Sequence, residues 1–325
     1  MNIFAANGAT SMKRCCMLIS IALLVVTTLL GCSEQIPEET STELTVQVAV
    51  TTDFGGDVLL DETIEVPPGT SVKDALLQVA DIETKYGGGF VQSINGVQSQ
   101  FPVKKDWFLY INGLSSNIGA EDYKLSDGDD ILFDFHDWRF RMFIPALIGN
   151  VPEPFLHGYQ GELHPTAIVY DDGFEKIARD LESSLFKLGV ADISTKSTDS
   201  LTETEKQHSN LILVCTTSGS LISELNQVWE KLGYFIHFDD ELITVYNSNG
   251  EVEAEYGAGY GMIQATQNPW NPSGIGVCEN VVWIVSGIDE DGVNSAAEAL
   301  IDHRDQLRYA YAVVIDHGEI LKVPQ

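Results

Sequence analysis

Hydroxyl side chains gather directly after an apolar run of the chain, at a place where nucleophilic chemistry could occur. Residues 211–215 read Leu-Ile-Leu-Val-Cys and lead into Thr216-Thr217-Ser218-Gly219-Ser220. Strand ends are a usual place for ligand contacts in α/β proteins. The cluster is not a Gly-x-Ser-x-Gly elbow, and none of the 7 histidines has a spacing that marks it as a base. Such clusters usually cap helices, so we expect no catalytic residue and no enzymatic activity.

A second candidate for chemistry is His136, which stands close to Asp134 and Asp137. An alternating strand places Asp134 and His136 on one face, where they could bind a cation. A strand end in contact with solvent is the plainer interpretation. The chain has no zinc-type CxxC pair and no Cys/His cluster with ligand spacing, so we expect no metal site.

Cys32 ends a segment whose residue types are typical of export signals. Residues 1–32 contain no acid, and Lys13 and Arg14 precede an apolar run at residues 17–30. This run is short for a membrane span. Leu29-Leu30-Gly31-Cys32 resembles the bacterial lipobox, which implies cleavage before Cys32 and a lipid on its thiol. An uncleaved N-terminal anchor is the alternative, and both place the body of the protein outside the cytoplasm, at a membrane.

Two further features of the chain stay open at this point. Met12, directly before the basic pair, is as natural a start as Met1. Only Cys215 and Cys278 remain unlipidated once residues 1–31 are removed. In an oxidising compartment these two could form a disulfide, or each could be a buried free thiol near a predicted strand.

The composition excludes some partners. The 325 residues include 48 acidic and 18 basic ones, a formal net charge of -30. That field repels nucleic acid and anionic lipid headgroups. Hydrophobic residues make up 44%, and the length suits about two domains with real cores. We therefore expect a folded protein that binds a small molecule or an envelope component and does not bind nucleic acid.

The elements that would position a site fall into two groups. Residues 33–43 read as a polar tether, and residues 44–141 as a domain rich in alternating strands with one helix capped by Ser71. This pattern predicts an α+β domain of β-grasp type. Residues 142–165 contain four prolines and no period, which indicates a linker. In residues 166–325, apolar strands followed by helices predict a small α/β domain with a mostly parallel sheet.

Four motifs in residues 69–138 resemble a known family. They are residues 69–76 (GTSVKDAL), 107–113 (WFLYING), 119–123 (GAEDY) and 127–131 (DGDDI). In this order they resemble a domain of unknown function shared by bacterial surface proteins and by the C-terminal β-domain of the cobalamin carriers transcobalamin and intrinsic factor. In those carriers the domain closes over one face of cobalamin, opposite a helical domain that has no counterpart here.

The resemblance implies a ligand site, with cobalamin as a possible bound molecule, on an aromatic strand and the loop after it. The positions that carry over are Trp107, Tyr110, Asn112, Gly113, Gly119 and Tyr123. Exposed aromatics and backbone amides could grip a flat ligand with a polar rim. The alternative is that Trp107 and Tyr123 are core residues and that Gly113 and Gly119 supply positive φ in turns.

Segments of the last domain resemble S-layer-type envelope proteins. They are residues 210–213, 261–263, 267–272 and 287–297. With the lipobox-like segment, these resemblances imply a membrane-anchored extracytoplasmic lipoprotein that binds a ligand without catalysis, with a corrinoid as the candidate ligand. A structural protein of the cell envelope, associated with a surface layer, is the alternative interpretation.

Overall fold

The residues from Leu44 to Thr52 form the first strand, β1, near the centre of a five-stranded sheet. The computed structural model describes residues 43–325. The predicted signal peptide (1–32) with Cys32, and the tether up to residue 42, lie outside the described residues. Within the described part of the chain, no helix is both long and apolar enough to cross a membrane.

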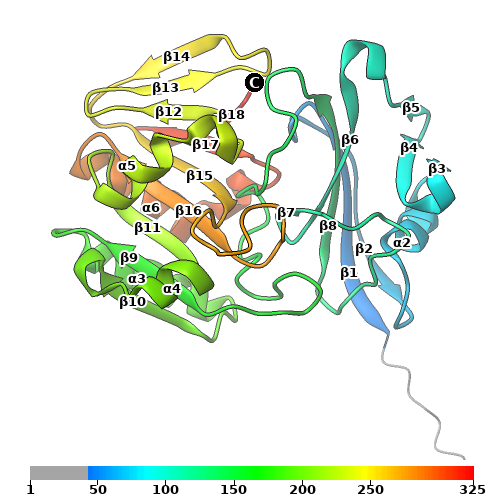
Figure 1. The fold of residues 1–325 in the computed structure, drawn as a ribbon, viewed down its shortest axis with the longest axis horizontal. Coiled ribbons are helices and arrows are strands. Elements are labelled where there is room, and N and C mark those ends of the chain that lie inside the picture. The colour runs from blue at the N-terminus through cyan, green and yellow to red at the C-terminus, as the bar shows by residue number, and fades with distance from the viewer. Residues whose placement is uncertain (1–42) are drawn as a thin grey trace, which may run out of the picture. The chain divides into compact units, whose positions relative to one another are not determined.

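We call residues 43–141 the first half of the described chain. Its main sheet has the order β2-β1-β8-β6-β7, with β1 parallel to β8 and the other neighbours antiparallel (Figure 1). A smaller sheet of three strands lies beside it. The further strands of the two sheets are β2 (Asp57–Val66), β3 (Ile82–Lys85), β4 (Phe90–Ile94), β5 (Val97–Gln98), β6 (Lys105–Ile111), β7 (Leu114–Ser115) and β8 (Asp130–Asp137).

The helix of the first half is α2 (Val72–Val79), and it begins where the sequence predicts. The Ser71 side chain accepts a hydrogen bond from the Asp74 amide at 3.1 Å and so caps the first turn. Val72, Ala75 and Leu76 point into the core, because they share one face of the helix. The combination of many strands with one helix confirms an α+β first half.

Both faces of the main sheet are covered at its centre, where β8 is buried along its whole length. Ile131, Phe133 and Phe135 belong to the core that contains α2. Leu132 lies on the opposite face and packs in a second core with residues of the last part of the chain. Alternation along a strand is compatible with one solvated face. Here the second face of β8 is covered as well, so the polar residues on that face are buried.

The second half, residues 166–325, is built on a seven-stranded sheet of order β10-β9-β11-β16-β15-β17-β18. Pairing is parallel from β10 through β9 and β11 to β16 and antiparallel in the remaining neighbours, so the sheet is mixed. Its strands are β9 (Thr166–Tyr170), β10 (Ile193–Ser197), β11 (Asn210–Thr216), β15 (Gly261–Gln267), β16 (Val281–Gly287), β17 (Ala312–Asp316) and β18 (Glu319–Val323).

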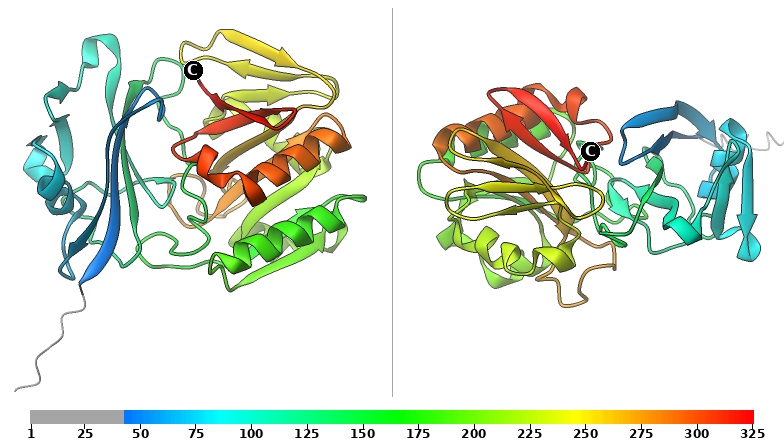
Figure 2. Two further views of the ribbon diagram at one scale, coloured as in Figure 1. Left: turned by 180° about the vertical axis from the view of Figure 1, so that it is seen from behind. Right: turned by 90° about the horizontal axis from the view of Figure 1, so that it is seen from above.

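Layers cover both faces of this sheet. The helices α3 (Glu175–Lys187) and α6 (Glu290–Asp302) pack side by side on one face (Figure 2, left). On the other face lie α5 (Ser220–Asn226) and a three-stranded antiparallel sheet, whose buried residues share a core with the alternate residues of β11. The remaining elements are α4 (Glu203–His208), β12 (Ile236–Phe238), β13 (Ile243–Tyr246) and β14 (Val252–Tyr256).

The segment predicted as a linker, residues 142–165, has no regular helix or strand, yet much of it is buried. Leu147 and Ile148 are excluded from solvent. The Leu147 amide donates to the carbonyl of Gly113 at 2.9 Å, and the Ile148 amide donates to the carbonyl of Ala310 at 3.1 Å. The segment thus bonds to both halves, and residues 43–325 lie in one compact unit.

Candidate functional site

A hollow of about 220 Å³ opens on the first half, on the face of the main sheet opposite the second half. Its walls are the aromatic Phe90, Trp107 and Phe133, the aliphatic Val91 and Leu109, and the loop of residues 116–120. Trp107 and Leu109 are two apart on β6, and Leu109 pairs with Phe133 of β8, so all three point to one face. The hollow is therefore a product of strand register.

Trp107 is held in a fixed orientation at the wall of the hollow. Its indole N–H donates to the backbone carbonyl of Val97 at 3.0 Å, and its ring lies 5.2 Å from that of Phe135. Only 7% of the residue is exposed. Since its polar atom is already bonded within the protein, Trp107 can offer a ligand an apolar ring surface and no free donor.

Gly119 lets the loop approach the small sheet closely. A Cβ atom on this residue would lie 2.9 Å from the carbonyl oxygen of Gly89, which is closer than real Cβ contacts. The amide of Ala120 donates to that same oxygen at 3.2 Å. Gly119 does not have a positive φ, so its expected role in a turn is wrong, and close packing is the reason for glycine here.

The polar side chains of the loop are committed to holding its shape. Asn117 donates to the carbonyl of Gly276 at 3.1 Å and accepts from the hydroxyl of Tyr159 at 3.1 Å. Ser116 lies 2.7 Å from the same hydroxyl. The loop is thus tied to the second half through residue 276, and the polar side chains of Ser116 and Asn117 already bond within the protein.

A strip of exposed aromatic rings continues outward from the hollow. We define the aromatic strip as Tyr86, Phe90 and Phe101. The Phe90 ring lies 6.3 Å from Tyr86 and 6.0 Å from Phe101, stacked with the latter. Tyr86 is 89% exposed and Phe101 55% exposed. Aromatic rings left in water next to a hollow are typical of ligand or partner sites.

Tyr110 and Tyr123 do not reach the hollow. Tyr110 lies on the other face of β6 and meets Tyr311, the residue directly before β17, edge to face, with ring centroids 5.6 Å apart. Tyr123 is fully buried, and its hydroxyl accepts from the amide of Gln160 at 2.9 Å. Burial raises the pKa of both phenols above the ordinary range. These two tyrosines stabilise the core, which the alternative interpretation of the sequence expected for Tyr123.

Asn112 and Gly113 form the tight turn between β6 and β7. Their φ angles are 51° and 74°, which is the arrangement that Asn-Gly favours in hairpins. Asn112 is buried; its amide group donates to Asp129 at 2.9 Å and to the carbonyl of Gly158 at 2.7 Å. Of the six residues taken from the resemblance, Trp107 and Gly119 alone line the hollow.

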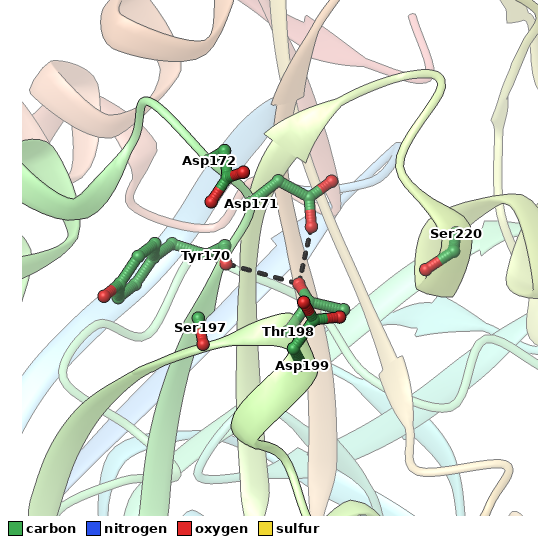
Figure 3. A pocket seen from close by; sticks show the side chains of 7 residues that line it. All are labelled: Tyr170, Asp171, Asp172, Ser197, Thr198, Asp199 and Ser220. Atoms are coloured by element: carbon green, nitrogen blue, oxygen red, sulfur yellow. Dashed lines mark hydrogen bonds between the residues drawn. The ribbon is translucent and has the colours of Figure 1, made fainter.

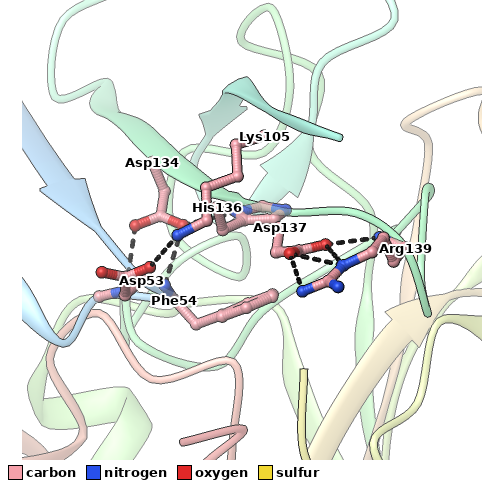
Figure 4. A network of polar contacts seen from close by, with 8 residues as sticks. Asp53, Phe54, Lys105, Asp134, His136, Asp137 and Arg139 are labelled. Atoms are coloured by element: carbon pink, nitrogen blue, oxygen red, sulfur yellow. Dashed lines mark hydrogen bonds and ion pairs between the residues drawn. The ribbon is translucent and has the colours of Figure 1, made fainter. Parts of the chain in front are cut away.

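His136 and Asp134 lie in the contact between the two halves, not at a solvated strand end, so that interpretation is wrong. The His136 Nδ1 atom lies 2.6 Å from Asp134 Oδ2 (Figure 4). The ring is stacked between Phe54 and Phe108, at centroid distances of 4.3 and 4.2 Å. Within residues 43–325 no group of three or more His, Cys, Asp or Glu side chains is placed to hold a metal ion.

Cys215 and Cys278 are both buried free thiols, so the disulfide that the sequence left open is not formed. The Cys278 thiol donates to the carbonyl of Ser115 at 3.2 Å. Burial raises the pKa of both thiols. Near Cys215, the Ser218 hydroxyl lies 2.9 Å from that of Thr216, and no histidine of the described chain hydrogen-bonds to Ser218 or Ser220.

Comparison with known proteins identifies one domain of the chain. Residues 69–137 match a family model described as a domain of unknown function (DUF4430). This confirms the prediction of such a domain over the four motifs. No curated protein matches the chain. The resemblance of the second half to S-layer-type domains stays a prediction.

Two solved structures have low similarity to the chain. One is haptocorrin in complex with Cbi, at 14% identity and a TM-score of 0.27, over 30% of this chain. The other is a candidate metal-binding protein from Ruminococcus gnavus, at 17% identity and a TM-score of 0.24, over 29% of this chain and 98% of that one. The chain spans about a quarter, 26%, of the haptocorrin chain. At these scores neither likeness carries an argument about this protein.

Proposed function

We propose that this chain is a non-enzymatic binding protein that captures a ligand with a flat, largely apolar face at the hollow of its first half. The observation that carries the proposal is the continuity of the hollow with the aromatic strip. Phe90 belongs to both, so one ligand can lie against the strip and place an edge in the hollow.

The exposed rings of the aromatic strip favour the binding of a ligand, because their apolar surface is not buried within the protein. Leaving large aromatic rings in water forgoes roughly 25 cal/mol for each Å² that could be buried. A ligand that covers Tyr86 and Phe101 recovers this free energy, and stacking on the rings adds to it. The lining of the hollow holds no ionisable side chain, which suits a neutral apolar edge.

A corrinoid is the first ligand to test. The family resemblance motivates it, as does the β-grasp-type interpretation of residues 44–141. Sites that enclose a whole drug-sized ligand are about 300–1,000 Å³. A hollow of about 220 Å³ admits only an edge of a corrinoid, so binding would be open on one side and weaker than in an enclosed carrier.

Absorption titration of the purified protein with cobalamin tests the proposal. We expect a saturable spectral shift that Phe90→Ala and Phe101→Ala weaken at least tenfold. Phe186→Ala is the matched control, because Phe186 is 64% exposed on α3, away from the hollow. The absence of any shift or retention of cobalamin by the unmodified protein removes the corrinoid, and equal affinity in all three variants removes the site.

The place of the protein in the cell is a second part of the proposal. It rests on the lipobox-like end of the signal at Cys32, and implies an extracytoplasmic body held at the membrane by a lipid. Cells fed labelled palmitate should incorporate it into the protein, and a Cys32→Ala form should not be labelled. An unlabelled native protein contradicts the anchor. Fractionation separates capture from a structural envelope role, since a layer protein would be abundant and co-extract with the wall.

A further inference from the structure

The sheet of the second half has a reversal of strand order at its parallel side. From β9 the chain passes through α3 to β10 on one side, and then through α4 to β11 on the other side of β9. The chain after β9 therefore runs toward β10, whereas the chain after β11 continues through α5 toward β15 and β16, on the side away from β9. In open α/β sheets, ligands bind in the crevice that such a switch point creates.

A crevice of about 350 Å³ lies at this switch point (Figure 3). Its lining comes from the ends of β9 and β10 and from the start of α5. The lining residues are Tyr170, Asp171, Asp172, Ser197, Thr198, Asp199 and Ser220. Ser220 faces Asp171 and Thr198 across the opening (Figure 3). The crevice is separate from the hollow of the first half, with which it shares no residue.

The carboxylate of Asp171 is held in position at the floor of the crevice. The Thr198 hydroxyl donates to Asp171 Oδ1 at 2.5 Å and lies 3.3 Å from the carbonyl of Tyr170. Gly219 leaves room beside the second oxygen, since a Cβ there would lie 2.9 Å from Asp171 Oδ2. One oxygen of Asp171 is thus bonded within the protein, and no hydrogen bond within the described chain is made by the other.

The chemistry of the lining selects the ligand. Four lining residues carry hydroxyls and three carry carboxylates, and none is Lys, Arg, His, Asn or Gln. Carboxylates only accept hydrogen bonds when ionised, and hydroxyls can accept as well. No basic side chain of the lining balances the three negative charges. A metal ion held by protein side chains alone does not fit, because no group of three metal-ligating side chains forms in residues 43–325.

We propose that this crevice binds a small organic ammonium ligand, of the size of a polyamine or an amino sugar, with an ammonium group at Asp171. An ammonium nitrogen offers several N–H donors and a positive charge to a site made of acceptors. The net charge of -30 attracts such cations to the surface, and the crevice provides the place where one is held.

Calorimetric titration of the purified protein with spermidine, glucosamine and N-acetylglucosamine tests this. We expect saturable 1:1 binding of spermidine or glucosamine, and none of the neutral acetylated sugar. Asp171→Asn should weaken binding about tenfold, the loss of one charge-assisted contact of roughly 1.4 kcal/mol. Asp240→Asn removes the same charge from an exposed position in the turn after β12, and should leave the affinity unchanged within about twofold.

Two outcomes overturn the proposal. One is the absence of saturable binding of both amines. The other is an equal loss of affinity in Asp171→Asn and Asp240→Asn, which would assign the attraction to overall charge. If thermal melting shows that Asp171→Asn is unfolded, Ser220→Ala takes its place. Ser220→Ala should then weaken binding of the amine, whereas Asp240→Asn should not. An unchanged affinity in Ser220→Ala contradicts the site.

Discussion

The imidazole of His136 and the carboxylate of Asp134 meet at 2.6 Å between the two halves of the protein, both excluded from solvent. They stand two residues apart on β8 and so share the face that the second half covers. The hydroxyl of Tyr311, the residue directly before β17, donates to Asp134 at 3.1 Å and completes the group from the second half. A polar cluster thus lies between the two sheets, within the core that they share.

This cluster predicts that stability falls in acid. Burial alone would raise the pKa of Asp134, but hydrogen bonds from His136 and Thr51 outweigh it and lower that pKa below its ordinary value. A carboxylate with a lowered folded-state pKa contributes stability above about pH 4, which is lost as the pH falls through the folded-state value. Denaturant unfolding between pH 3 and pH 7 should show this loss.

The variant Asp134→Asn should remove that part of the pH dependence and cost roughly 3 kcal/mol at neutral pH, because it removes the buried carboxylate to which Thr51, Tyr311 and two backbone amides donate. Asp53→Asn is the control, since the Asp53 side chain is 61% exposed and pairs with Lys105 at 3.4 Å. That change should cost less than about 1 kcal/mol. A small effect of Asp134→Asn, equal to that of the control, would contradict the interpretation.

Arg141 should resist even a conservative replacement. Its guanidinium carbon lies 3.8 Å from the ring centroid of Phe140 and 4.6 Å from that of Trp229, and its Nε donates to the carbonyl of Tyr234 at 3.0 Å. Lysine cannot stack as a plane or make the same hydrogen bond. We expect Arg141→Lys to lower the free energy of unfolding by about 1–2 kcal/mol. Arg179→Lys on exposed α3 should change it by less than about 0.5 kcal/mol.

Gly119→Ala should damage both stability and the hollow. The new methyl group would meet the Gly89 backbone at 2.9 Å, where no flexible side chain can move away. Forced overpacking of this kind costs typically 1–3 kcal/mol. Gly257→Ala has its nearest neighbour at 3.8 Å and a φ that is not positive, so it should be nearly neutral. Chemical denaturation compares the two; an equally neutral Gly119→Ala would show that the loop is free to shift.

The two thiols should be unreactive in the folded protein. Cys215 and Cys278 are buried, and their raised pKa values disfavour the thiolate that reacts. A thiol reagent such as DTNB should label neither residue until denaturant is added, and mass spectrometry should find both in reduced form. Rapid labelling under native conditions would contradict this. So would a disulfide-linked pair of the two cysteine-containing peptides, with a mass two units below the sum of the separate peptides.

Local pattern predicted much of the secondary structure. Alternation of apolar residues indicated β1, β6 and β8, and the Ser71 cap marked the start of α2. Apolar runs indicated β9, β11 and β16, and all three pair in parallel. The antiparallel strands β15, β17 and β18 were not predicted, although residues 312–315 of β17 form an apolar run, and their pairing depends on contacts between segments distant in sequence.

The candidate site was predicted only in part, for a reason that the strand period explains. The motif at residues 107–113 is continuous, but successive side chains of a strand point to opposite faces. Trp107 therefore lines the hollow while Tyr110 packs against the second half. The alternation of side chains along β6 is enough to place Trp107 and Tyr110 on opposite faces of the sheet. It does not show which face is open, because that depends on which face the second half covers.

The sequence by itself determined the acidic charge, the motifs of the DUF4430 match and the positions of the strands that have a clear period, since these depend on neighbouring residues alone. The tertiary structure decided which faces are buried, that residues 142–165 bond to both halves, and that Phe90 and Phe101 join Trp107 at one place. Burial and convergence depend on segments far apart in the chain, and local periodicity carries no information about them.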